Sequence, residues 1–178
     1  MTSLHAAPRP LLLLYAGVLL IGTHAAEGAD RSAKASASVI RPIAVTRVTD
    51  LSFGRLQGTA QDGTVTLPAR APSKPVATAV TMVKGGTTES AFERQLSGEP
   101  GRLYRVTVPA STYTTTGRLL VNAFTLWTAN RQDVSSTKMS VFDKKGADTL
   151  RLGATLRVPK NTPLAQYDAQ VAVTISYE

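Results

Sequence analysis

Cysteine is absent from the 178-residue sequence, and histidine occurs only at His5 and His24. A chain without thiols forms no disulfide and no thiolate zinc site. Both histidines lie in an N-terminal segment that we predict to be removed. The mature domain then lacks both residue types, which excludes Ser-His-Asp catalysis, Cys-His catalysis and typical zinc centres.

Other catalytic patterns are also missing. The twelve acidic residues are dispersed, and none forms the D-x-D-x-D-G loop that gathers oxygen ligands for calcium. Residues 135–138 fit S-x-x-K without its companion motifs, and residues 84–88 have the composition of a phosphate loop without its order. We predict no enzymatic activity, no metal and no cofactor. A hydrolase that uses carboxylates distant in sequence, or a Ser and a Lys, is a less favoured alternative.

Long hydrophobic runs are scarce. One apolar run extends from Leu11 to Gly22, follows Arg9, and precedes the small residues of 23–26. It is shorter than the roughly 20 residues that a membrane-spanning helix needs, and it is typical of a secretory signal peptide. We predict a signal peptide over 1–26, no transmembrane segment after cleavage, and export to the periplasm, the cell surface or the medium.

The charge is one-sided: 20 Lys and Arg face 12 Asp and Glu, which gives +8 for the whole chain. Without Arg9 of the predicted signal peptide the charge is +7. The basic residues are scattered, and Lys144-Lys145 is their only doublet. Scattered charge is typical of a solvated surface, whereas nucleic-acid sites cluster it on one face. We predict that nucleic acid is not a partner. Weak attraction to an acidic polymer of the cell surface is the alternative role for the positive charge.

Apolar residues recur with period two along most of the chain, and no helical period persists. Residues 149–158 are the clearest case, since Leu150, Leu152, Ala154, Leu156 and Val158 share one face. In segment 118–127 the odd-numbered and the even-numbered residues are both mostly apolar, which predicts a central strand covered on both faces. Further strands are expected at 64–67, 76–83, 90–95, 102–109 and 138–142. Turn signals separate these segments, so we predict an all-β, antiparallel β-sandwich over 39–178, preceded by a flexible arm over 27–38.

Apolar and polar residues alternate near both ends of the mature chain. Residues 167–178 predict one long C-terminal pairing strand, whose apolar face carries Tyr167, Val171, Val173, Ile175 and Tyr177. Near the N-terminus, a second alternating set forms a candidate donor arm of Ala35, Ala37, Val39, Ile43 and Val45. This set predicts either an ordinary first strand with a frayed arm or a strand supplied to another subunit.

Several blocks together resemble a bacterial exported family, the domain of unknown function DUF4402, whose members are similar to pilin-like β-sandwiches. They occur in the family's order over nearly the whole mature chain. The blocks are 42–43, 50–54, 63–67, 98–101, 104–106, 150–156, Tyr167 and 173–177.

The closing segment also resembles the C-terminus of chaperone–usher pilins. Tyr177 matches their penultimate aromatic residue, whereas Ala165 and Ala169 stand where that signature has glycine. The resemblance implies an immunoglobulin-like, pilin-like sandwich from a Gram-negative bacterium. It implies a non-enzymatic fimbrial subunit that self-associates, or binds a periplasmic chaperone, through strand pairing.

A monomeric secreted or surface binding module is the alternative. It would recognise a glycan or a protein through loops such as 112–116 or 130–137, and its N-terminal arm would be dispensable or would fold back on its own sheet.

Overall fold

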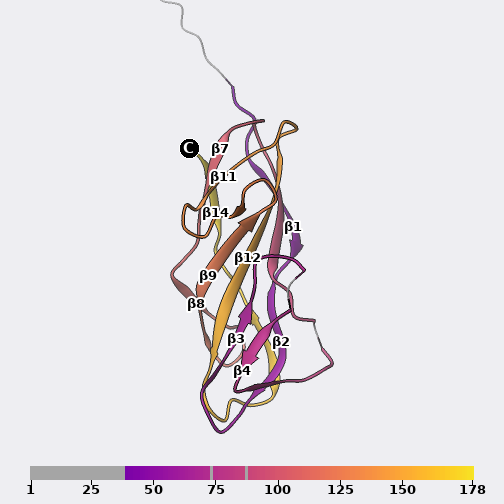
Figure 1. Ribbon diagram of the computed structural model, residues 1–178, viewed down its shortest axis with the longest axis vertical. Coiled ribbons are helices and arrows are strands. Elements are labelled where there is room, and N and C mark those ends of the chain that lie inside the picture. Colours follow the sequence, from indigo (N-terminus) through magenta and orange to yellow (C-terminus); the bar gives the residue numbers. More distant parts are fainter. Residues whose placement is uncertain (1–38, 73, 87) are drawn as a thin grey trace, which may run out of the picture. The chain divides into compact units, whose positions relative to one another are not determined.

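The computed structural model describes residues 39–72, 74–86 and 88–178, which contain fourteen strands and no helix (Figure 1). The predicted signal peptide (1–26) and arm (27–38), with Ala35 and Ala37, lie outside the described residues. No helix in the described part is long and apolar enough to span a bilayer.

The strands form one eight-stranded and two three-stranded sheets, and every strand pair is antiparallel. In the large sheet, one path runs β1-β6-β12-β3-β4, and the other edge of β12 pairs with β9, which also pairs with β8 and β10. The small sheets are β11-β7-β14 and β13-β2-β5. Because all three sheets contribute to one hydrophobic core, the chain is an all-β, antiparallel β-sandwich, as predicted. The strands are β1 (Ala44–Thr49), β2 (Leu51–Gly58), β3 (Gly63–Leu67), β4 (Val76–Thr78), β5 (Val80–Met82), β6 (Phe92–Ser97), β7 (Leu103–Thr107), β8 (Ser111–Tyr113), β9 (Leu120–Thr128), β10 (Gln132–Asp133), β11 (Met139–Val141), β12 (Ala147–Val158), β13 (Ala165–Ala169) and β14 (Thr174–Tyr177).

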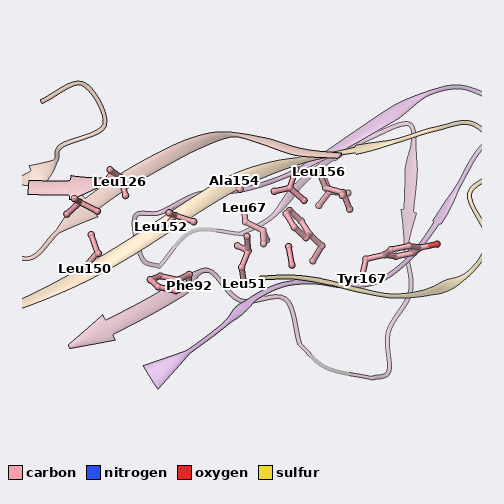
Figure 2. Packing of buried hydrophobic residues seen from close by; sticks show 14 of the residues in the cluster. Leu51, Leu67, Phe92, Leu126, Leu150, Leu152, Ala154, Leu156 and Tyr167 are labelled. Atoms are coloured by element: carbon pink, nitrogen blue, oxygen red, sulfur yellow. The ribbon is translucent and has the colours of Figure 1, made fainter. Parts of the chain in front are cut away.

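The core is organised around β12, the longest strand. Its predicted apolar face, which includes Leu150, Leu152 and Leu156, is fully buried, while Arg157 on the other face is exposed. Leu51 and Tyr167 belong to the same buried cluster and come from the small sheet β13-β2-β5 (Figure 2). Each such side chain contributes about 1.5–3 kcal/mol by leaving water, so this contact holds the layers together.

Strand β9 differs from the prediction that both its faces are covered. Val121 and Leu126 are both buried although they have opposite parity, and Ala123 and Thr125 between them are exposed. The cause is a β-bulge: Ala123 has a φ of 49°, and the β12–β9 register skips one residue between Gly153 and Thr155. The bulge moves the apolar residues of both parities to one face.

Residues 76–83 also differ from the prediction of one strand. Ala79 has a φ of 52°, which breaks the segment. Strand β4 before it pairs with β3 in the large sheet, whereas β5 after it pairs with β2 in the opposite layer. The break lets the chain change sheets.

The predicted single C-terminal strand is wrong for the same kind of reason. Strand β13 pairs with β2 and β14 pairs with β7, so the chain passes from one small sheet to the other over residues 170–173. The odd-numbered residues still face inward throughout. Ala165 and Ala169, at the pilin glycine positions, lie in β13 and are not among the described residues with positive φ.

Candidate functional site

An open groove lies between the first strand of the domain and the last residues of the chain. One wall carries Ile43 and Val45, and the other carries Val171, Val173 and Ile175. Phe92 and Arg94 of β6 also line the groove, whose volume is about 300 Å³. The apolar residues are only partly buried, apart from the exposed Val45 and the buried Phe92.

The groove is open because the strands beside it have unused edges. Strand β1 ends the large sheet and pairs only with β6, while β14 ends a small sheet and pairs only with β7. Within the described chain, residues 171–173 have no strand partner. Free backbone groups beside apolar side chains form a surface on which another β-strand can pair.

The structure brings together residues from both candidate sets. Val171, Val173 and Ile175 face the groove, whereas Tyr167 is buried in the core. Ile43 and Val45 were predicted in the donor arm but lie in the opposite wall, where Val45 pairs with Leu96 of β6. Val45 is paired within its own sheet, and Ile43 lies in the groove wall directly before β1, so the free arm is restricted to residues before Ile43.

Val39, a member of the predicted arm, is 95% exposed, so this apolar side chain has almost no contact with its own domain.

Two residues of the groove, Phe92 and Arg94, were not in either predicted set. They belong to β6, and no sequence pattern indicates that β6 lies beside β1, since this pairing joins segments more than forty residues apart.

At one end the groove continues into a larger cavity of about 680 Å³, with Phe92, Arg94 and Val171 common to both. Arg94 donates to Asp50 Oδ1 at 2.9 Å and to the Thr49 carbonyl at 2.6 Å. Its guanidinium lies 3.9 Å from the centre of the Phe92 ring, and partial burial lowers its pKa. Arg47 forms a second ion pair with Asp50. Both arginines are paired within the chain, which leaves the apolar walls as the part of the groove that another strand would cover.

Tyr177 fixes the C-terminus beside the groove. Its hydroxyl donates to the Arg41 carbonyl and accepts from the Glu99 amide, both at 2.6 Å. A Cβ at Gly98 would lie 2.6 Å from this hydroxyl, so glycine is required for the approach. Glu178 also forms an ion pair with Arg105 of β7. The Tyr177 contacts connect the end of β14 to the segment before β1 and to the turn after β6, whereas the ion pair and the strand ladder hold it against β7.

A buried polar network connects the layers. Asp148 of β12 is 5% exposed, and its Oδ2 accepts from Tyr104 and Ser140, each at 2.8 Å. Its Oδ1 accepts from the backbone amides of Thr149 at 2.7 Å and Asn130 at 3.2 Å. Burial, followed by the Asp148 charge, raises the pKa of Tyr104, which keeps the phenol protonated as a donor. With four donors around one carboxylate, the network is a structural link between β12, β7 and β11.

The described residues contain no group of three or more His, Cys, Asp or Glu side chains that could hold a metal ion. The acidic side chains next to the groove are paired with arginine, as Asp50 is, or engaged by other polar side chains, as Asp168 is by Gln166.

A family model described as "Domain of unknown function (DUF4402)" matches residues 43–177. No curated protein matches the chain, and no solved structure does. The match begins at Ile43 in one wall of the groove and ends at Tyr177, so it includes both walls.

Proposed function

The chain belongs to the DUF4402 family, and on this premise we propose that it is an exported, non-enzymatic structural subunit that assembles by strand exchange. In this proposal, the groove of one copy binds the N-terminal arm of another, in a pilin-like polymer on the surface of a Gram-negative bacterium. The fold would then be an immunoglobulin-like sandwich that is completed by its neighbour.

The open groove carries the proposal. A β-strand placed in it would hydrogen-bond with the free edge of β1 or β14 and direct alternate side chains onto Val171, Val173 and Ile175. This would remove apolar surface from water on both walls, at about 25 cal/mol for each Å². Both the backbone and the side chains of the groove therefore suit an extended segment with period-two apolar residues.

The N-terminal arm has this pattern. Ala35, Ala37 and Val39 are spaced by two residues, so in an extended conformation they share one face. If paired as a strand, the twelve residues 27–38 would span about 40 Å, compared with about 20 Å for the six residues of β1. The arm is thus long enough to reach a groove on a second copy. Before assembly, a periplasmic chaperone strand could cover the same groove.

Deleting residues 30–37 tests the proposal. We expect the deletion to abolish multimers and leave the domain folded, because the described residues between Ile43 and Tyr177 form a hydrophobic core of their own. The measurement compares unheated and boiled protein from the cell surface by electrophoresis in SDS, with thermal melting of the purified domain as the folding check. Wild-type protein should give a ladder that collapses on boiling.

A matched control replaces Ser36 and Ser38 with threonine, which alters the opposite face of the arm and keeps its length. This variant should assemble as wild type does. Equal multimers after the deletion would refute strand exchange through the arm. A wild-type monomer in both samples would favour a self-contained binding module.

A further inference from the structure

A second cavity, separate from the groove, opens on the solvent-facing side of the large sheet. Its volume is about 620 Å³, and it shares no lining residue with the groove. Its floor is a row of outward-facing residues across five strands, defined by the strand registers. The row runs Tyr113, Leu120, Arg157, Thr64 and Thr78.

One end of this cleft carries an aromatic ring and a cation. Tyr113 is 53% exposed, and the Arg118 guanidinium lies 5.6 Å from the centre of its ring. Gly117 and Arg118, in the turn between β8 and β9, have φ of 67° and 49°. A positive φ costs energy in a residue with a long side chain such as arginine. The turn that requires it is the one that places the Arg118 guanidinium over the Tyr113 ring.

The cleft has an excess of positive charge. Arg118 and Arg157 are both exposed, and neither belongs to a salt bridge among the described residues. The one acidic residue in the lining is Asp62, and its Oδ1 accepts from the Lys160 backbone amide at 2.8 Å. The two guanidiniums are therefore available to an anion from solution.

We infer that this cleft binds an acidic polysaccharide, a chain of sugars that carry carboxylates. A sugar ring would lie on the face of Tyr113, and its carboxylate would accept hydrogen bonds from Arg157 or Arg118 in the planar geometry that guanidinium favours. Leu120 and the threonines provide a floor for the neighbouring sugar. Single-stranded nucleic acid fits less well, since it uses several aromatic residues for successive bases, and the cleft has only Tyr113.

The test measures binding of the full mature protein to polygalacturonate by titration calorimetry at fixed salt. Fully methyl-esterified polygalacturonate has the same sugar chain without the charge. We expect binding to the acid, and at least about tenfold weaker binding to the ester, because charge-assisted hydrogen bonds are lost. Equal binding of both polymers, or no binding of the acid, would overturn the inference.

Variants locate the site. Arg157→Gln and Tyr113→Ala should each weaken binding about tenfold. Arg131→Gln removes the same charge beyond the other end of β9, about 25 Å from the cleft, and should leave affinity unchanged. Equal weakening by Arg131→Gln would mean that the polymer is attracted non-specifically by the net charge, which would overturn the inference. If a single-stranded oligonucleotide binds as tightly and Tyr113→Ala and Arg157→Gln weaken its binding, the ligand is nucleic acid and not a polysaccharide. Because the groove is not involved, a failed arm-deletion test would leave this inference standing.

Discussion

Val173→Asp is expected to abolish multimers of the chain while each subunit remains folded. Val173 lies in the wall of the open groove and is partly buried against the core, so in the monomer the new carboxylate loses some apolar packing but keeps contact with water. Once a donor strand fills the groove, that carboxylate is buried without a partner. Such burial costs about 3 kcal/mol or more, which corresponds to a loss of over 100-fold in the strength of subunit association.

The matched control is Thr174→Asp, which adds the same charge one residue further on, at an exposed position. Both variants would be compared with wild type by unheated electrophoresis in SDS and by chemical denaturation of the monomer. Thr174→Asp should assemble normally. If Val173→Asp assembles as well as this control, the groove is not the assembly site; if it unfolds the monomer, Val173 belongs to the core of the isolated domain.

Asp148→Ala is expected to lower the free energy of unfolding by about 3–5 kcal/mol. The Asp148 carboxylate accepts four hydrogen bonds in a buried site, two from hydroxyls and two from backbone amides. Alanine leaves these donors without that acceptor, and an unsatisfied buried donor costs about 1–3 kcal/mol. The individual costs are not additive because neighbouring groups and water compensate in part.

Tyr104→Phe provides the graded comparison, since it removes one donor and preserves the ring that packs 4.6 Å from Phe142. It should cost about 1 kcal/mol. Urea denaturation of both variants measures the difference. An Asp148→Ala domain no less stable than Tyr104→Phe would mean that Asp148 does not link the layers.

The sequence predicted the buried faces well wherever one strand keeps one alternation. Leu150, Leu152 and Leu156 are buried as expected because the period of two is a local property of β12. In the same way, Val171, Val173 and Ile175 are more buried than their even-numbered neighbours, as alternation predicted, although strand pairing is interrupted between β13 and β14.

The breaks in strands were not predictable from alternation. Ala79 and Ala123 take positive φ without being glycine, so neither the sheet change at 79 nor the bulge at 123 has a sequence signal. The groove depends on which segments become edges. That is decided by long-range pairing, such as Val45 with Leu96 and Thr174 with Thr107, rather than by local pattern.

The polysaccharide cleft depends on register even more strongly. Tyr113 and Arg157 are 44 positions apart, and three strand pairings place them in one row with Thr64. A shift of one residue in any pairing would move a member of the row to the other face of the sheet. Sequence reasoning named the loop 112–116 only as part of the alternative binding module, and alternation gives no means of naming its neighbours in the sheet.

The most direct test of strand exchange is disulfide trapping between two differently tagged copies. Wild type has no cysteine, so Val173→Cys in one copy and Ala35→Cys or Ala37→Cys in the other supply the only thiols. A disulfide forms when the two Cβ atoms lie about 4 Å apart. Strand exchange predicts an oxidised dimer that carries both tags, and little of it when Ser36→Cys replaces the alanine variants. No mixed dimer, or as much mixed dimer with Ser36→Cys as with the alanine-position variants, would contradict strand exchange.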